Sequence, residues 1–408
     1  MQGKRVNVTI PPGIFRNGSD YQQRGRWNEG NLVRWVDDRI RPISGWRAST
    51  LPAIASFTPR AMLSWRSNAG RLRLAIAGVE GLRGLNDDRT VWVSVSPTGG
   101  VLAMSATSTY ASTGVSATNA PAGQWSLDTF GEILLAVQPS DGQLIQWDGI
   151  APGGAVPIPT AVVPAGSPTG NRAVVVTPER FVFCLGAGSD ARKVAWASQE
   201  SLTDWTASSS NTAGDFNLAT TGMLVAGRRT KNETLLWTTR DVHVARYIGG
   251  TLVYSFAQLS DGCGLASAQA ALAVGDVAYW MSPDARFYLY NGAVQEIPCD
   301  LRDYLLADMD LRNVSLISSM RLSKFNELWW FYRSTSATGN SLDSYVAYNT
   351  VMGIWMHGRI DRACGVDAEH TEYPLMADNT AGVYEHEVGV LRTGASTAPY
   401  LRSGPITV

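Results

Sequence analysis

Short apolar runs recur along the chain, and almost none has the 3.6-residue spacing of an amphipathic helix. The runs are alternating or continuously apolar, and each ends at Gly, Asn, Asp or Ser. That pattern is typical of β-strands bounded by turns. The strongest runs lie at 71–78, 132–138, 180–186, 233–239, 276–282, 327–333 and 372–378. The pattern predicts an all-β protein.

The runs return at a nearly constant spacing of roughly fifty residues, a period that marks propellers and other repeat architectures. Segments of small apolar residues precede them, as at 172–178 and 268–274, and suit a crowded innermost strand. After most runs come a polar turn and a further strand-like segment with an aromatic residue, at 142–149, 192–198, 241–247, 286–292, 344–350 and 381–387. With a variable outer strand, each unit forms a four-stranded antiparallel blade.

Seven such units lie between residues 58 and 391. We therefore predict a β-propeller of seven, or alternatively six, four-stranded blades. The 14 Trp and 14 Tyr residues of the chain would mainly fill the space between blades. Two face-packed sheets are the structural alternative, but they would not require a regular repeat.

One segment, 299–316, has helical spacing, with Leu301, Leu305, Leu306 and Met309 on one face. It predicts a helix packed on the outside of a blade. Two stretches rich in Gly, Pro, Ala and Ser, at 94–124 and 149–171, predict long loops at one rim. Long loops on a rigid scaffold are common binding regions.

Composition and charge narrow the function classes. The net charge of −1 means that the protein as a whole lacks the positive charge that favours nucleic-acid binding. Residues 1–89 nevertheless carry a net charge of +8, so the cationic character is confined to one end. The four cysteines are far apart and fit buried positions better than a disulfide framework. We find no apolar run long enough for a transmembrane helix and no signal-peptide pattern, so contact with a membrane is not expected.

Candidate catalytic and metal-binding residues are sparse. Residues 282–290 match only the Ser and Asp of a sialidase-type Asp-box, which favours a turn with a packed aromatic. His370, Glu372, Glu385 and His386 could meet across a hairpin and bind a metal, but a solvated hairpin with cross-strand charge pairs is the favoured interpretation. The acidic pairs Asp37–Asp38 and Asp87–Asp88 suit turns better than catalysis. We expect no catalytic residue, cofactor or metal.

Residues 25–46 combine tryptophans with arginines. Such a strip could stack on single-stranded nucleic acid, which requires exposed Trp27, Trp35 and Trp46. The alternation of apolar and polar positions argues instead for a buried face and an outer rim of arginines directed at a partner protein. The buried face would contain Leu32, Val33, Trp35, Val36, Ile40 and Ile43, and the rim Arg34, Arg39 and Arg41.

The sequence GNLVRWVDDRIRPISGW, residues 30–46, resembles the N-terminal signature of the tail nozzle proteins of short-tailed bacteriophages, also described as tail-tube or packaged-DNA-stabilising proteins. Further similar segments are 194–216, 259–270 and 400–408, so the resemblance extends over nearly the whole chain. Chains of this family can continue with further β structure beyond the point that corresponds to Val408.

The resemblance implies a propeller subunit of a homo-oligomeric ring, commonly a hexamer, mounted below the portal and its adaptor. Such a ring retains packaged DNA and conducts it during ejection, with transient contacts to the DNA that are independent of base sequence. It belongs to the virion, is assembled in the host cytoplasm, and also meets tail fibre or spike proteins. A small β platform formed by residues 1–55 and 392–408 would flank the propeller, residues 56–391.

On this interpretation the platform supplies the partner and oligomer interface, with these residues at its centre: Arg24, Arg26, Trp27, Asn31, Arg34, Trp35, Arg39, Arg41 and Trp46. The main alternative is a receptor- or polysaccharide-binding tail propeller, or a degenerate glycosidase. That alternative predicts a concave pocket with clustered exposed aromatics at one rim, and the glycosidase version adds a carboxylate pair.

Overall fold

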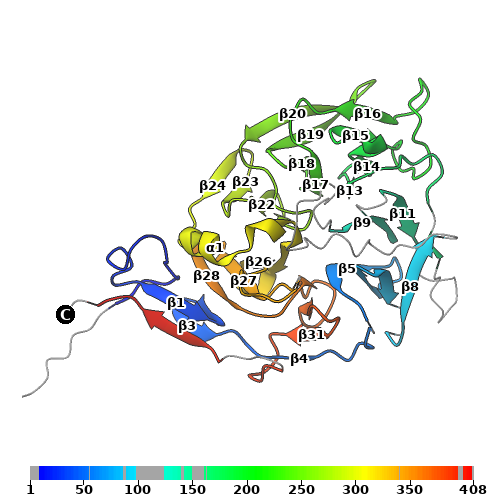
Figure 1. Cartoon of the computed structure of the whole chain (residues 1–408). Helices are drawn as coiled ribbons and strands as arrows, with labels where there is room; N and C mark the ends of the chain where they lie inside the picture. The colour runs from blue at the N-terminus through cyan, green and yellow to red at the C-terminus, as the bar shows by residue number, and fades with distance from the viewer. Residues whose placement is uncertain are drawn as a thin grey trace, which may run out of the picture.

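The chain forms a ring of seven radial β-sheets in the computed structural model (Figure 1). The structure describes residues 9–54, 56–85, 89–97, 124–138, 142–148, 160–161, 163–339, 341–393 and 398–406. The arrangement is a seven-bladed β-propeller, which confirms the fold that the sequence period predicts. Both loop-rich stretches, 94–124 and 149–171, fall largely outside the described residues.

The strands of the first three blades follow one another from the axis outward. Their bounds are β5 (Pro59–Arg66), β6 (Leu72–Gly78), β7 (Gly81–Leu85) and β8 (Trp92–Pro97); β9 (Ser126–Phe130), β10 (Ile133–Val137) and β11 (Leu144–Trp147); and β13 (Ala173–Val176), β14 (Val182–Leu185), β15 (Lys193–Trp196) and β16 (Gly214–Asn217). A short strand, β12 (Thr160–Ala161), pairs in parallel with β8 at the outer edge of the first blade.

The next three blades each have four antiparallel strands. They are β17 (Leu224–Arg229), β18 (Thr234–Thr238), β19 (Asp241–Gly249) and β20 (Val253–Asp261); β21 (Ala271–Val274), β22 (Val277–Met281), β23 (Phe287–Tyr290) and β24 (Val294–Ile297); and β25 (Ser318–Leu322), β26 (Glu327–Tyr332), β27 (Ser344–Asn349) and β28 (Ile354–Arg359).

Each strong apolar run of the sequence is the second strand of its blade. These strands are mostly apolar because both of their faces pack against neighbouring blades; every residue of β26 is buried, for example. Aromatic side chains span the gaps between blades, as where Trp237 meets Trp280 with ring centroids 5.5 Å apart and Phe287 meets Trp330 at 5.0 Å. Tryptophans such as Trp237, Trp280 and Trp330 therefore fill the space between blades, as predicted.

The innermost strands contact one another in a closed circuit, from β5 through β9, β13, β17, β21 and β25 to β29 and back to β5. The seventh blade contains β29 (Cys364–Val366), β30 (Leu375–Ala377), β31 (Val383–His386) and β4 (Trp46–Ala48). Strand β4 pairs with β31, so one blade joins both halves of the chain and holds the ring closed. The predicted domain boundary after residue 55 is corrected here, because Trp46–Ala48 belongs to the propeller.

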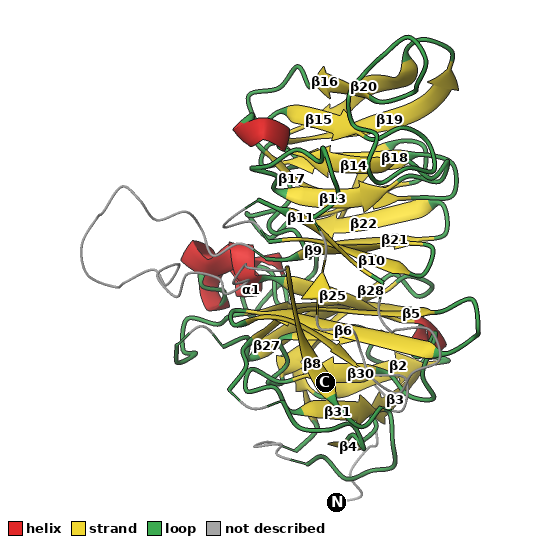
Figure 2. Ribbon diagram, turned by 90° about the vertical axis from the view of Figure 1, so that its right-hand side faces the viewer, coloured by secondary structure: helices red, strands yellow, loops and turns green. Residues whose placement is uncertain are grey.

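The predicted helix over 299–316 is broken into two pieces. Helix α1 (Arg302–Asp308) ends where Met309 adopts an extended backbone, and a 3-10 turn, η3 (Leu311–Leu316), follows. The side chain of Asp310 accepts a hydrogen bond from the Arg312 N–H and starts that second piece. The segment lies on one face of the ring, where it connects the fifth blade to the sixth (Figure 2). Two shorter 3-10 turns are η2 (Ala187–Ser189) and η4 (Ser323–Phe325).

A small platform lies outside the ring beside β28 (Figure 1). It consists of β1 (Trp27–Asn31) paired with β32 (Tyr400–Ser403), and of the hairpin formed by β2 (Val33–Val36) and β3 (Arg39–Pro42). Segments from near both ends of the described chain therefore pair in one unit. No helix in the described part of the chain is long and apolar enough to cross a membrane.

Candidate functional site

The tight turn of hairpin β2–β3 determines how its arginines are displayed. Asp37 and Asp38 have φ of 50° and 59°. Positive φ at both central residues characterises a two-residue type I′ turn, and Asp tolerates that conformation better than most residues. The register places Arg34 opposite Arg41, at the end of the hairpin away from the turn. Every residue of β3 is exposed, including Arg39 and Arg41.

Arg34 is buried, whereas the sequence pattern directs it toward a partner. Its side chain is 2% exposed, and Nη2 lies 3.0 Å from Glu327 Oε2 and 2.8 Å from Glu387 Oε1. The guanidinium also lies over the ring of Phe325, 3.7 Å from its centroid. The Trp329 indole donates to the same Glu327 oxygen at 2.9 Å. We call Arg34, Glu327 and Glu387 the buried ion cluster.

The cluster connects three parts of the molecule. Arg34 comes from the platform, Glu327 from the sixth blade, and Glu387 directly after the last strand of the seventh. Burial raises the pKa of Glu327 above 4.5, although Arg34 opposes that shift. Removing one partner from a buried ion cluster leaves an uncompensated charge, at a cost of about 3–5 kcal/mol. Arg34 is therefore part of the junction between platform and propeller.

Three further predicted interface residues are also internal. Trp35 is buried against the sixth blade. Trp46 stacks on His386 with ring centroids 5.1 Å apart, and its Nε1 donates to the Thr393 carbonyl at 2.7 Å. Asn31 is buried, and its Oδ1 accepts from the Arg359 N–H at 2.7 Å, which ties β1 to β28. Asn31 and Trp35 attach the platform to the ring, whereas Trp46 is part of the seventh blade and holds the segment at Thr393.

Arg26 and Trp27 are intermediate in exposure. Arg26 pairs with Asp300 at 3.7 Å and lies over the Phe15 ring, while Trp27 packs beside the core of the sixth blade. Arg24 is exposed. Within the described residues, Arg24, Arg39 and Arg41 form no ion pair and no side-chain hydrogen bond.

Apolar side chains accompany these free cations. Ile40, between Arg39 and Arg41, is 44% exposed, whereas the alternation of the sequence predicts it to be buried. Its strand has no layer of the protein on either face, so no face of β3 is interior. Tyr21 and Tyr400 are exposed on the same small unit. We call Arg24, Arg39, Ile40, Arg41 and Tyr400 the platform surface.

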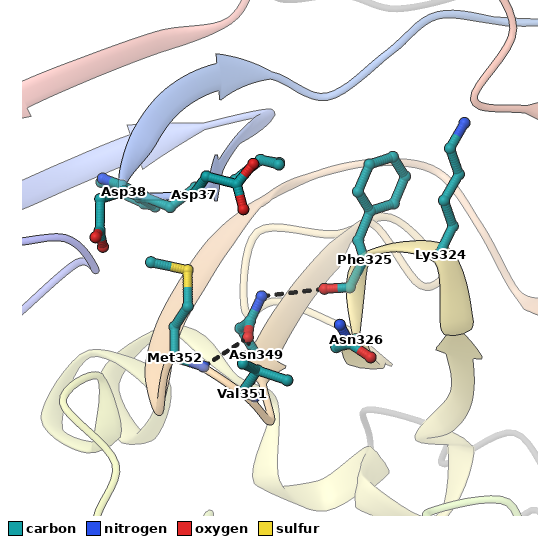
Figure 3. A pocket seen from close by; sticks show the side chains of 10 residues that line it. Asp37, Asp38, Lys324, Phe325, Asn326, Asn349, Val351 and Met352 are labelled. Carbon is teal, nitrogen blue, oxygen red and sulfur yellow. Dashed lines mark hydrogen bonds between the residues drawn. The ribbon is translucent and has the colours of Figure 1, made fainter.

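A cleft of about 260 Å³ separates the β2–β3 turn from the turns of the sixth blade (Figure 3). Asp37 projects over it from the hairpin, and Met352 faces the hairpin from the opposite side. Asn349 builds its floor, because its side chain donates to the Phe325 carbonyl at 3.1 Å and accepts from the Met352 N–H at 2.9 Å. The cleft is smaller than the roughly 300–1,000 Å³ usual for small-molecule sites.

A second, smaller pocket of about 90 Å³ is also lined by Phe325 and lies between turns of the sixth and seventh blades. We call it the turn pocket. Asp367, Glu372 and Glu387 line it together with the rings of Phe325 and Tyr373.

Hydrogen bonds cross the propeller axis at the face that carries α1. Gln124, just before β9, donates to the Ile317 carbonyl at 3.2 Å, and Gln269, just before β21, donates to the Trp125 carbonyl at 2.6 Å. These bonds join the second blade to the sixth and fifth blades on the opposite side of the ring. The axis of a single chain is thus bridged by protein at that end.

The predicted histidine hairpin does not gather a metal site. His386 is buried, and its Nε2 accepts from Arg362 Nε at 2.8 Å. Burial, together with Arg362, holds the pKa of His386 well below 6.5, so the ring is neutral. Glu385 points away and pairs with Arg47 at 2.8 Å. The described residues contain no group of three or more His, Cys, Asp or Glu side chains suited to a metal ion.

The Asp-box-like segment is a turn with a packed aromatic, as interpreted from sequence. Ser282 Oγ accepts from the Arg286 N–H at 3.2 Å, Ala285 has φ of 58°, and Phe287 is fully buried. All four cysteines are free and buried, as expected. Of the two acidic pairs, Asp37–Asp38 forms the hairpin turn, and Asp87–Asp88 lies outside the described residues.

Sequence reasoning missed Glu327, Glu387 and Phe325. A signal for Glu327 existed, because a carboxylate opens the most apolar run of the chain, ELWWFYR, and a charge there requires a buried partner. Nothing local identifies that partner as Arg34, which is 293 residues away.

No protein-family profile matches the chain, and no curated protein matches it. Among solved structures, the chain is similar to the Myceliophteria thermophila Cps50 (Swd1) β-propeller domain, with 10% identity, a TM-score of 0.47, and 84% of this chain and 98% of that one covered. It is also similar to the computationally designed Ika8 protein, with 11% identity, a TM-score of 0.44, and coverage of 92% and 99%. Neither similarity bears on function.

Proposed function

We propose that this chain is a ring-forming structural subunit of a short phage tail, placed below the portal and adaptor. The observation that carries the proposal is the platform surface. Both chain ends build a separate unit on the perimeter of a rigid propeller, and that unit presents three arginines with no partner among the described residues. A display of unpaired arginines beside exposed apolar side chains suits contact with another protein.

The bridged axis supports a duct formed between copies. Because hydrogen bonds cross the axis of the propeller, DNA would pass through the centre of a ring of chains and not through one chain. The net charge of −1 fits this role, since a lumen that bound phosphates tightly would retain the DNA it must release. Contacts with DNA would be transient and independent of base sequence.

The proposed place in the tail also implies which proteins the ring would contact. The platform would meet the adaptor of the head–tail connector, and the outer blades would be available to fibre or spike proteins. The location is the virion, after assembly in the host cytoplasm. The copy number that the resemblance implies is six.

Electron microscopy of the full chain mixed with the adaptor of the same virus tests the proposal. We expect a closed ring attached to the adaptor, with Arg39 and Arg41 covered. A variant with Arg39→Glu and Arg41→Glu should stay folded and fail to join, whereas Arg180→Glu on the third blade should join normally, because Arg180 lies outside the platform. A chain that neither forms rings nor binds the adaptor contradicts the proposal.

One observation favours the alternative, a polysaccharide-binding tail propeller. Phe216 is exposed on the outer strand β16 and stacks on Phe256 of β20, with ring centroids 4.6 Å apart and planes 6° apart. Exposed aromatic rings can stack on sugar faces. Binding of the full chain to host surface polysaccharide, lost on Phe216→Ala, would support this function over the structural one.

A further inference from the structure

The turn pocket has the size and lining of a receptor for one basic side chain. At about 90 Å³ it is far below the roughly 300–1,000 Å³ of small-molecule sites, and it suits the end of a single side chain. Carboxylates from Asp367, Glu372 and Glu387 line it, together with two aromatic rings. Aromatic rings beside carboxylates attract ammonium and guanidinium groups.

An unsatisfied atom points to the same chemistry. The Glu387 side chain is 4% exposed, and its Oε1 lies 2.8 Å from Arg34. The other oxygen, Oε2, is buried without a hydrogen-bond partner among the described residues. A buried acceptor left unpaired costs free energy, so a donor entering the pocket would be stabilised there.

Three cations of the same chain stand near the pocket, and none of them satisfies Glu387 Oε2. Arg47 lies over the Tyr373 ring, 5.6 Å from its centroid, but its guanidinium pairs with Glu385 at 2.8 Å. Lys324 also lines the pocket, but it is exposed and its Nζ lies over the Phe325 ring, 5.4 Å from the centroid.

Arg34 is already shared between Glu327 and Glu387. One guanidinium thus faces two buried carboxylates, and the turn adds the exposed carboxylate of Glu372. The Asp367 carboxylate also carries negative charge at the pocket, although its oxygens already accept the N–H groups of Ser323 and Ala368 at 2.9 and 2.8 Å.

Complementary charges are present on β3 of the same sequence. Arg39 and Arg41 are exposed and unpaired among the described residues, and Ile40 between them is 44% exposed. Strand β3 is an edge strand that pairs only with β2, so another surface can approach it. The turn of the seventh blade that borders the pocket is acidic, with Asp367, Glu369 and Glu372.

We propose that the turn pocket receives an arginine of β3, Arg39 or Arg41, from a second copy of this chain. The contact is heterologous, since one surface of a copy meets a different surface of the next. Such contacts close into rings when the rotation permits. The inference rests on the proposed ring and specifies a contact that would hold it together.

Charge exchange tests the contact through the self-association of the full chain, measured by sedimentation velocity. Glu372→Lys alone should weaken self-association by about tenfold to a hundredfold, because a repulsive pair replaces an attractive one. Adding Arg39→Glu or Arg41→Glu to that variant should restore it. Glu369→Lys is the matched control, because Glu369 is exposed in the same turn and does not line the pocket.

A cysteine pair identifies the partner directly. Chains with Arg39→Cys or Arg41→Cys, mixed with chains carrying Glu372→Cys, should form a disulfide between copies under oxidising conditions. The native cysteines are buried and should stay silent. Unchanged thermal stability of each variant confirms that it is folded.

The outcomes separate this inference from the proposed function. Rings that form on the adaptor while neither charge exchange nor crosslinking succeeds would overturn the contact and leave the function intact. Charge exchange and crosslinking that succeed in a chain with no affinity for the adaptor would support the contact and contradict the function. A chain that is monomeric at every concentration overturns the contact.

Discussion

The propeller and the platform are stabilised in different ways. Large apolar side chains stabilise the contacts between the blades; Trp237, Trp280 and Trp330, for example, are fully buried. The platform has two two-stranded sheets, which are too small to fold alone. It depends on strand pairing, on packing against the sixth blade and on the buried ion cluster. The difference separates a rigid scaffold from a unit whose orientation is set by a few specific contacts.

The largest loss in the free energy of unfolding should come from a substitution between the blades of the propeller. Trp330→Ala removes a fully buried indole that packs on Phe287 and donates to the Ala270 carbonyl at 2.9 Å. We expect a loss of about 5 kcal/mol in the free energy of unfolding, at the upper end for aromatic deletions. Urea denaturation measures it. Trp27→Ala in the platform is the comparison and should cost much less, because Trp27 is only half-buried.

The next largest effect on the free energy of unfolding should come from the buried ion cluster, which joins the platform to the propeller. Arg34→Met leaves Glu327 and Glu387 without their cation and should cost about 3 kcal/mol. Arg39→Met is the matched control and should be nearly neutral, since Arg39 is exposed. Adding Glu327→Gln and Glu387→Gln should recover most of the loss. Equal stability of the Arg34 and Arg39 variants would show that the cluster does not hold the platform.

A smaller effect depends on pH. Burial raises the pKa of Glu327 in the folded state, so the folded protein binds a proton at a pH where the unfolded chain does not. The contribution of Glu327 to stability should therefore increase as pH falls from above its folded-state pKa toward 4.5, its ordinary value. Thermal unfolding measures this effect: as the pH falls over this range, the wild type should gain thermal stability relative to Glu327→Gln, which cannot bind the proton. A stability difference between the two proteins that does not change with pH would contradict the raised pKa of Glu327.

The smallest effect on stability should come from the platform surface. Replacing Arg24, Arg39 and Arg41 by Ala should change the free energy of unfolding by about 0.5 kcal/mol or less each, because none has a partner in the described chain. The same variants should lose capture of the adaptor in a pull-down. Loss of stability together with binding would remove the distinction between scaffold and binding unit.

The propeller could be predicted because its signals are local and repeated. Each second strand is apolar on both faces, so 180–186 and 327–333 stand out in the sequence, and the spacing between runs reports the blade. Small residues at 172–178 marked an innermost strand correctly, as β13 shows. The predictions that failed concern positions whose surroundings come from distant segments.

The platform illustrates those failures. Alternation along residues 32–43 predicts an exposed Arg34 and a buried Ile40, and the reverse is found. Consecutive residues Val33, Arg34 and Trp35 of β2 are all buried, whereas every residue of β3 is exposed. Neither strand therefore has one buried and one exposed face, and period-two alternation does not predict burial there. His386 was expected on a solvated face and is covered by Trp46, because β4 joins that sheet from the other end of the chain.

By itself, the sequence determined the blade and the apolar filling between blades, because these follow from side-chain periodicity within a few consecutive residues, and it left seven or six as the number of blades. Only the tertiary structure decided which strand closes the ring, which arginine is buried and which remain free. Those outcomes depend on partners hundreds of residues apart, such as Glu327 for Arg34. Such an ion pair contributes to stability only after folding of the ring has brought its two residues into contact.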